Sequence, residues 1–155
     1  MRKGGRTKYL GWALVSLLLS GGYLAYESLR ITAPAAPSPD RLTLGRKLYD
    51  ETCAACHGAE LEGQANWRAR DSNGLLPAPP HDATGHTWHH SDQQLFEITK
   101  RGTAALVGSD YQTAMGPFAE VLSDDEIRAV LAYIKSRWPE NIRARQAEVT
   151  ARSGN

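Results

Sequence analysis

Apolar residues recur along this chain at the three- and four-residue spacing of α-helices rather than in the strict alternation of a half-buried strand. The first such stretch begins at Ser38 or Asp40 and runs up to a pair of cysteines. Leu44, Leu48 and Tyr49 share one face of this stretch, so we expect that face to be buried. The pattern therefore predicts an amphipathic helix near the start of a folded domain.

Two later stretches begin with the sequence of a capping box, in which a serine and the residue three positions on exchange hydrogen bonds. Ser91–Gln94 predicts a helix that ends at Arg101, and Ser123–Glu126 predicts a helix that continues to about Arg137. Residues 58–90 are rich in glycine, proline, asparagine and aspartate, so they predict a long loop. No stretch is typical of a strand, and we therefore expect an all-α fold of three to five helices.

An uncharged apolar run, residues 9–26, follows a basic segment, residues 1–8. At about 1.5 Å per residue a helix of this length spans roughly 27 Å, near the lower limit for crossing a bilayer. The basic flank predicts a cytoplasmic N-terminus and an exported remainder. The run therefore predicts a transmembrane anchor, and a cleaved signal sequence is the alternative interpretation.

Three segments complete the predicted organisation. Residues 27–39 form a linker rich in proline and alanine, a composition that favours an extended and semi-rigid chain. Residues 40–138 form the folded domain, and residues 139–155 form a polar C-terminal tail, for which a frayed helix over residues 140–155 is the alternative interpretation. The chain of 155 residues carries a net charge of only +1 and has no basic patch, so its composition does not favour binding to nucleic acid.

The sequence Cys53-Ala54-Ala55-Cys56-His57 is the C-x-x-C-H pattern by which c-type haem is attached. Two thiols three positions apart on a helical turn can each form a thioether with a porphyrin vinyl group, and the following histidine can ligate the iron. These are the only cysteines of the chain, so none remains for a disulfide. A redox dithiol, which expects a βαβ context, and a zinc site, which needs four ligands, are the competing interpretations. The motif predicts one covalent haem c with His57 as an axial ligand.

Met115 is the expected second axial ligand, in a loop before the last predicted helix. The other methionine, Met1, precedes the apolar run. A thioether holds low-spin iron and raises the reduction potential relative to a second imidazole. An open, five-coordinate iron is one alternative. Ligation by a second histidine is another, with four candidates in the loop: His81, His86, His89 and His90.

Taken together, these residues resemble the class I (monohaem) cytochrome c family, in particular its membrane-anchored bacterial members. The resemblance covers roughly residues 40–138. It is carried by Gly45-x-x-x-Tyr49-x-x-x-Cys53-x-x-Cys56-His57, a proline-rich middle, Met115 in a loop, and Val130-x-x-Tyr133 on the last helix. The resemblance implies a cytochrome c-like fold around one covalent haem, in which Gly45 and Tyr49 pack against Val130 and Tyr133.

The resemblance also implies roles for residues around the haem. Members of this family use a proline carbonyl to accept a hydrogen bond from the ligating imidazole, and such a bond fixes the orientation of the ring. Pro79 is the expected acceptor, with Pro77 and Pro80 as alternatives. The residues expected to bind the haem propionates are Trp88 and Arg68, with Trp67 and Arg70 as further candidates.

The function that the resemblance implies is one-electron transfer in a bacterial respiratory chain, without enzymatic activity or a catalytic residue. The expected partners are donor and acceptor redox proteins in or at the membrane, and no small-molecule substrate. The expected location is the bacterial inner membrane, with the haem domain in the periplasm, or the periplasm itself if the signal is cleaved. A haem-based redox or gas sensor and a small haem subunit of a larger respiratory enzyme are the alternatives.

Overall fold

The computed structural model describes residues 36–108 and 110–154. The chain divides into two compact units, Met1–Ala36 and Pro37–Asn155, and every helix named below belongs to the second. The predicted basic N-terminus, the predicted anchor of residues 9–26 and most of the predicted linker lie outside the described residues. Within the described part of the chain, no helix is both long and apolar enough to span a membrane.

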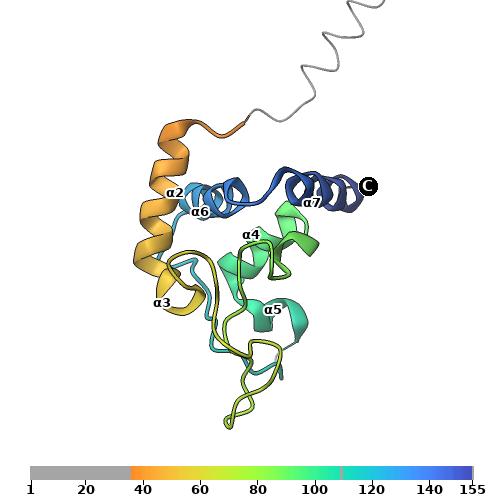
Figure 1. Cartoon of the computed structure of the whole chain (residues 1–155). Coiled ribbons are helices and arrows are strands. Elements are labelled where there is room, and N and C mark those ends of the chain that lie inside the picture. Colours follow the sequence, from red (N-terminus) through yellow and green to blue (C-terminus); the bar gives the residue numbers. More distant parts are fainter. Residues whose placement is uncertain (1–35, 109, 155) are drawn as a thin grey trace, which may run out of the picture. The chain divides into compact units, whose positions relative to one another are not determined.

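Helices make up the regular secondary structure of the described residues (Figure 1), and this confirms the all-α prediction. In chain order they are α2 (Pro39–Thr52), α3 (Ala54–His57), the 3₁₀ helix η1 (Thr87–His89), α4 (Asp92–Arg101), α5 (Thr103–Val107), α6 (Asp124–Ser136) and α7 (Glu140–Ser153). The α-helices outnumber the three to five expected. The reason is that the C-x-x-C-H turn forms a short helix of its own, and that α5 and α7 lack capping boxes by which a sequence reveals a helix start.

Serine side chains cap the starts of the three helices that the sequence predicts. Ser38 Oγ accepts a hydrogen bond from the Arg41 backbone N–H at 3.3 Å. Ser91 Oγ accepts one from Gln94 N–H at 3.3 Å. These bonds satisfy backbone donors that have no partner within the helix, and each such cap is worth about 1 kcal/mol. The sequence therefore predicts these helix starts correctly.

The cap of α6 is a complete capping box. Ser123 Oγ accepts a hydrogen bond from the Glu126 backbone N–H at 3.4 Å, and the Glu126 carboxylate accepts one from the Ser123 N–H at 2.8 Å. Two hydrogen bonds from Ser123 lower the pKa of the Glu126 carboxyl, and the bond from the backbone N–H has a larger effect than the bond from the hydroxyl. The start of α6 is therefore held by a reciprocal pair of bonds that depends on an ionised carboxylate.

Helices α2 and α6 cross in direct backbone contact at Gly45. This glycine is buried, and a Cβ built on it would collide with the backbone carbonyl of Ala129. One turn later on α2, the Tyr49 ring lies 5.5 Å from the Tyr133 ring of α6. Leu44, in contrast, is 43% exposed, so the prediction that it faces the core is wrong. The buried face of α2 is centred on Gly45 because the closest approach of two helices leaves no room for a side chain.

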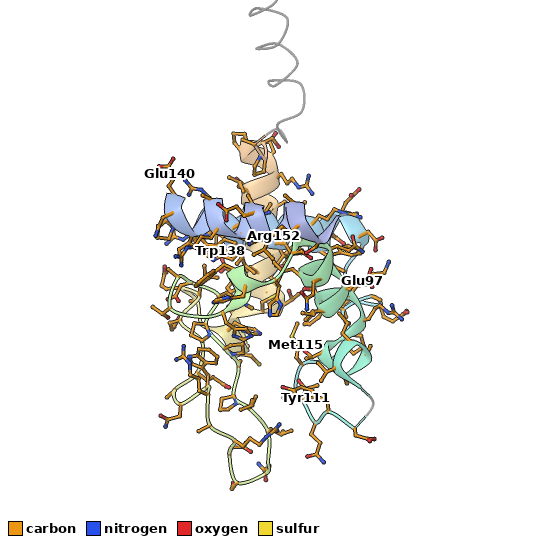
Figure 2. The ribbon with its side chains drawn as sticks, turned by 90° about the vertical axis from the view of Figure 1, so that its right-hand side faces the viewer. Glu97, Tyr111, Met115, Trp138, Glu140 and Arg152 are labelled. Atoms are coloured by element: carbon orange, nitrogen blue, oxygen red, sulfur yellow. The ribbon has the colours of Figure 1, made fainter. Side chains whose placement is uncertain are left out.

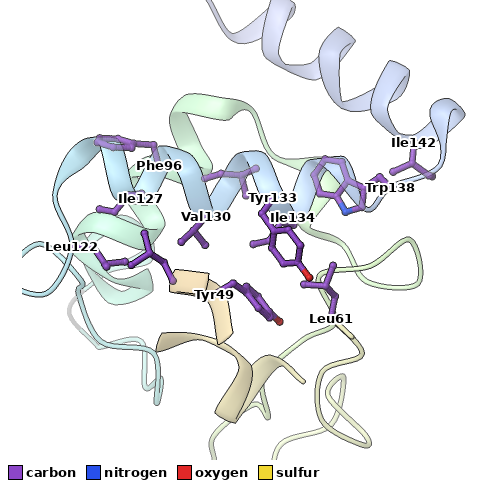
Figure 3. Close-up of a cluster of buried hydrophobic side chains, with 12 residues drawn as sticks. Tyr49, Leu61, Phe96, Leu122, Ile127, Val130, Tyr133, Ile134, Trp138 and Ile142 are labelled. Carbon is purple, nitrogen blue, oxygen red and sulfur yellow. The ribbon is translucent and has the colours of Figure 1, made fainter. Parts of the chain in front are cut away.

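A cluster of buried hydrophobic side chains lies along α6 (Figure 3). Its members are Leu48, Tyr49, Leu61, Leu95, Phe96, Leu122, Ile127, Val130, Tyr133, Ile134, Trp138 and Ile142. Helix α6 packs against α2 and also against α4, so it forms the centre of the domain. Two ion pairs at half-exposed positions, Lys100–Asp124 and Lys135–Asp92, also join α4 to α6. Exposed pairs of this kind contribute at most about 1 kcal/mol each, so burial of the apolar cluster stabilises the packing of these helices more than the ion pairs do.

The C-terminal residues form the helix α7, where the sequence predicts a polar segment that is either a tail or a frayed helix. Two of its side chains, Ile142 and Gln146, are buried, and α7 packs against η1. The helix is mostly polar and carries only one buried apolar side chain, so the hydrophobic periodicity that would predict it is missing. Its position depends on tertiary hydrogen bonds rather than on an apolar face.

Replacing Gly45 with alanine tests the helix crossing. The added methyl group would force α2 away from α6, so we expect the free energy of unfolding to fall by about 2 kcal/mol, a typical cost of overpacking. Leu44→Ala is the matched control, because this neighbour is exposed and should change stability by less than about 0.5 kcal/mol. Denaturant unfolding of both variants measures the difference, and equal effects would contradict the crossing.

Replacing Glu126 with glutamine tests the capping box. The folded-state pKa of Glu126 lies below its ordinary value of 4.5, so its contribution to stability is present above that pH and is lost as the pH falls through the folded-state pKa. Glu126→Gln should therefore be less stable than the parent protein near neutral pH, and the two should converge in acid. Thermal unfolding over a pH series measures this, with the exposed α7 residue changed in Glu148→Gln as the control. A stability difference that is independent of pH would contradict it.

Candidate functional site

The C-x-x-C-H motif continues the helix α2 by one further turn. The Cys53 N–H still donates to the Tyr49 carbonyl at 2.9 Å, and the His57 N–H donates to the Cys53 carbonyl at 2.9 Å. Both thiols are free; Cys53 is partly buried and Cys56 is exposed. Burial raises the pKa of the Cys53 thiol, which a hydrogen bond with Thr52 partly offsets. One helical turn therefore presents two thiols and an imidazole together.

The His57 imidazole is buried and held in one orientation. Its Nδ1 lies 2.9 Å from the Pro79 carbonyl oxygen, and because a carbonyl can only accept, Nδ1 carries the proton. Burial lowers the pKa of His57, and the bond to Pro79 opposes this shift. The ring is therefore held neutral with Nε2 unprotonated, which is the form that ligates a metal.

Short hydrogen bonds place the Pro79 carbonyl beside this ring. Gln64 pairs with Ala78, since its N–H donates to the Ala78 carbonyl and its Oε1 accepts from the Ala78 N–H, both at 2.8 Å. The Gly63 N–H donates to the His57 carbonyl at 2.7 Å. Gly63 has φ 68°, and a Cβ built on it would collide with the Pro79–Pro80 peptide. The loop can pass this close to the proline pair only because residue 63 has no side chain.

A second imidazole, His81, stacks on His57. The ring centroids are 3.9 Å apart and the planes are inclined by 20°. The Thr87 hydroxyl donates to the Pro80 carbonyl and is therefore free to accept from His81 Nδ1, which lies 2.8 Å away. Burial, followed by the neighbouring His57 and His86, lowers the pKa of His81 well below its usual value. The stack covers one face of the His57 ring and leaves the Nε2 edge free.

Trp88 has a buried hydrogen-bond donor without an acceptor. Of the buried side-chain nitrogen and oxygen atoms in the described residues, Trp88 Nε1 is the one that finds no partner in the protein. Leaving such a donor unsatisfied costs about 1–3 kcal/mol, so its position indicates an acceptor that the polypeptide does not supply. A haem carboxylate is an acceptor of the right kind.

Met115 is half-buried in the loop after α5. Its backbone N–H donates to Thr113 Oγ1 at 3.1 Å, and its sulfur lies 3.9 Å from Thr103 Oγ1 of α5. Figure 2 shows Met115 beside α5, while the loop of residues 58–90 runs down the other side of the domain. The structure therefore brings Cys53, Cys56, His57 and Pro79 into one group and places Met115 on a separate loop.

Arg68 is exposed and lies at the end of a stack of aromatic side chains. Its guanidinium lies 3.9 Å from the centre of the Trp67 ring, and Trp67 in turn stacks on His86 at 5.3 Å. Arg70 donates to the Gly74 carbonyl of its own loop, and its guanidinium lies 5.9 Å from the centre of the Tyr111 ring.

Several residues that shape the site have little or no signal in the sequence. The Tyr49 hydroxyl donates to the Gly58 carbonyl at 2.8 Å, directly after the motif. Leu61 is buried with φ 71°, an uncommon conformation for a bulky side chain, and its carbonyl accepts from the His81 N–H at 2.8 Å. Of these residues, Tyr49 could be found by its spacing from Cys53. The roles of Leu61, Gln64 and His81 depend on contacts across a loop.

The residues present fit a covalent haem. They supply two free thiols for thioether bonds, a neutral imidazole with a free Nε2, and an unpartnered donor at Trp88 for a carboxylate. Half-buried apolar side chains that could cover a porphyrin lie around the core: Cys53, Ala54, Ala83, Trp88, Phe118 and Leu131. Within the described residues no group of three or more His, Cys, Asp or Glu is placed to hold a metal ion.

Comparison with known proteins identifies a family. The model of the family described as Cytochrome c matches residues 42–138, which is more than half of the chain. No curated protein matches this chain. The family match ends at Trp138 and so includes α6 but not α7.

Replacing both cysteines with serine tests haem attachment. The variant Cys53→Ser/Cys56→Ser has no thiol for a thioether bond, so we expect no haem to remain attached after denaturing electrophoresis, and a large loss of stability because the haem completes the core. Cys56→Ser alone is the control and should retain one thioether. Haem staining and denaturant unfolding measure the two effects. A haem-free double variant as stable as the parent holoprotein would contradict a structural role for the haem.

Proposed function

Because this chain belongs to the cytochrome c family, we propose that it carries single electrons through one haem c whose iron is ligated by His57 and Met115. Proteins of this family bind haem c covalently and are in general electron carriers rather than enzymes. The observation that carries the proposal is the neutral His57 imidazole, which directly follows two free thiols and has Nε2 available.

The chain's own residues have distinct tasks in this function. When bound, haem c supplies an iron that alternates between the ferrous and ferric states. Cys53 and Cys56 would tether it, and His57 would ligate the iron through Nε2. The hydrogen bond to the Pro79 carbonyl holds the imidazole ring and increases its basicity, which stabilises the ferric state. Electron transfer of this kind needs no side chain that acts as a general base or a nucleophile.

Two observations favour Met115 over His81 and His86 as the second ligand. His81 is already engaged, since its ring is stacked on His57 and its Nδ1 lies 2.8 Å from the Thr87 hydroxyl. His86 stacks on Trp67 in the exposed group described above. Met115 lies on a different loop, beside α5, with a thioether that can bind iron in both oxidation states.

Saturated ligation by His57 and Met115 would keep oxygen and other small molecules off the iron. This supports a carrier over a gas sensor. The exposed Cys56 offers a side from which a redox partner can approach, while Cys53 and His57 are more buried. Such a partner needs only transient contact at this side to exchange an electron.

We propose membrane-associated redox proteins of a bacterial respiratory chain as donor and acceptor. The apolar run of residues 9–26, after a basic N-terminus, supports a single-pass anchor in the inner membrane with the haem domain in the periplasm. Cleavage of that run would instead release a soluble periplasmic carrier. Mass spectrometry of the mature protein distinguishes these cases and also reports the added haem mass.

Replacing Met115 with alanine tests the second ligand. Loss of the sulfur should abolish the red charge-transfer band of the ferric protein, let carbon monoxide bind rapidly to the ferrous protein, and lower the reduction potential by on the order of 0.1 V, within the range of about 0.8 V that axial ligands span. Val121→Ala, at an exposed position after the same loop, is the control. Unchanged spectra and potential in Met115→Ala would refute ligation by this residue.

Met115→His gives a complementary result. A second imidazole should restore six-coordination and block carbon monoxide, with a potential that remains below that of the parent protein. If the parent protein itself bound carbon monoxide rapidly, the sensor interpretation would replace the carrier.

A further inference from the structure

Helix α7 lies outside the family match, yet it buries a polar side chain completely. Residues 42–138 match the family, whereas α7 spans Glu140–Ser153. Gln146, near the middle of α7, is only 1% exposed. Burial of an amide is unfavourable unless its hydrogen bonds are satisfied, so the partners of Gln146 indicate why it is there.

The Gln146 amide joins α7 to the start of α4. Its Nε2, which carries two hydrogens, lies within hydrogen-bond distance of three acceptors: Asp92 Oδ1 at 2.7 Å, the His90 carbonyl oxygen at 3.2 Å and Thr150 Oγ1 at 3.1 Å. Thr150 Oγ1 also accepts from the Asp92 backbone N–H at 3.1 Å. Asp92 is further held by Lys135 Nζ of α6 at 2.6 Å. These bonds fix the backbone at residues 90–92 to α7.

The other end of the same segment is fixed by Trp138, which lies in the connection between α6 and α7. Trp138 is 1% exposed, and its Nε1 donates to the His81 carbonyl at 2.7 Å. Arg143 of α7 donates to the Trp138 carbonyl at 2.6 Å. Figure 2 shows Trp138 beside α7. The segment from His81 to Asp92 is therefore held at both ends by the C-terminal part of the chain.

Trp88 lies within this doubly held segment. It belongs to η1, the element against which α7 packs, and the guanidinium of Arg145 on α7 lies 6.0 Å from its ring centre. Its indole N–H is the buried donor without a protein acceptor. A buried donor can keep its direction toward an external acceptor only if the backbone that carries it does not move.

We propose that α7 is a positioning element for the haem site, and that Gln146 is the positioning residue that holds residues 90–92 so that the Trp88 indole N–H faces a haem carboxylate. The inference rests on the proposed function, because it needs a bound haem whose potential can be measured. Gln146 itself touches neither the haem ligands nor the thiols and acts through the backbone of η1.

A double-mutant cycle on the holoprotein tests this inference. Gln146→Leu keeps the side-chain volume but removes the amide, and Trp88→Phe removes the indole donor. In Gln146→Leu we expect a lower midpoint potential, because a carboxylate that loses a hydrogen bond places more effective negative charge near the iron and favours the ferric state. We also expect faster hydrogen exchange at the Trp88 indole N–H, by about tenfold for the loss of hydrogen-bonded protection.

The cycle separates positioning from a general loss of stability. In a Trp88→Phe background, Gln146→Leu should cause no further shift of the potential. An equal shift in both backgrounds, or no shift in either, would overturn the inference. Rapid exchange of the Trp88 indole N–H in the parent holoprotein would also overturn it, since the donor would then face water. Glu148→Gln, on the exposed side of α7, is the control and should leave the potential and the exchange rate unchanged.

Two further measurements keep the test decisive. If Gln146→Leu does not yield folded holoprotein, Thr150→Val replaces it, because this change removes the hydroxyl that bonds both Gln146 and Asp92 and should produce a smaller shift in the same direction. Covalent haem and the red charge-transfer band are recorded for every variant. If both are normal while the potential does not shift, only the role of α7 fails. If the parent protein lacks them, the proposed function fails instead.

Discussion

At the crossing of α2 and α6, no side chain of α2 separates its backbone at Gly45 from the carbonyl of Ala129. One turn further along α2, Tyr49 is fully buried, packs on Tyr133 and donates to the Gly58 carbonyl after the motif. One more turn leads to Cys53. The positions of the two thiols and of the imidazole are thus set from α6, at the centre of the core, through a helix whose backbone packs directly against it. A haem bound covalently to this turn would therefore be held in place relative to α6.

Before η1, the loop that begins at residue 58 is ordered by hydrogen bonds rather than by regular secondary structure. Gln64 pairs with Ala78, the Leu61 carbonyl accepts from His81 N–H, and Gly63 lies against the proline pair. The outcome of these bonds is a carbonyl group aimed at His57 Nδ1. A carbonyl in this place selects the tautomer of the ring and leaves Nε2 unprotonated, which is the form that could ligate the iron of a bound haem.

The C-terminal helix adds a second support to the same loop. Trp138 donates to the His81 carbonyl, and Gln146 donates to the His90 carbonyl. The C-terminal part of the chain therefore holds both ends of the segment that contains Trp88. The amide of Gln146 is buried because its hydrogen bonds are made there, and the polar character of α7 is consistent with this use. The domain thus combines an apolar core along α6 with a polar network at the η1 side, and the two meet at Trp138.

Local chemistry in the sequence determined much of this protein by itself. Cys53, Cys56 and His57 act within one helical turn, and the serine caps act within three residues, so their spacing alone predicts them; Gly45 could be predicted from the family resemblance. The tertiary structure alone decided that Leu44 is exposed, that His81 stacks on His57, and that the Gln146 side chain is buried. Each of these depends on a partner far away in the chain, as when Gln146 reaches the His90 carbonyl. A sequence shows which hydrogen-bonding groups exist, but only the folded chain determines which of them meet.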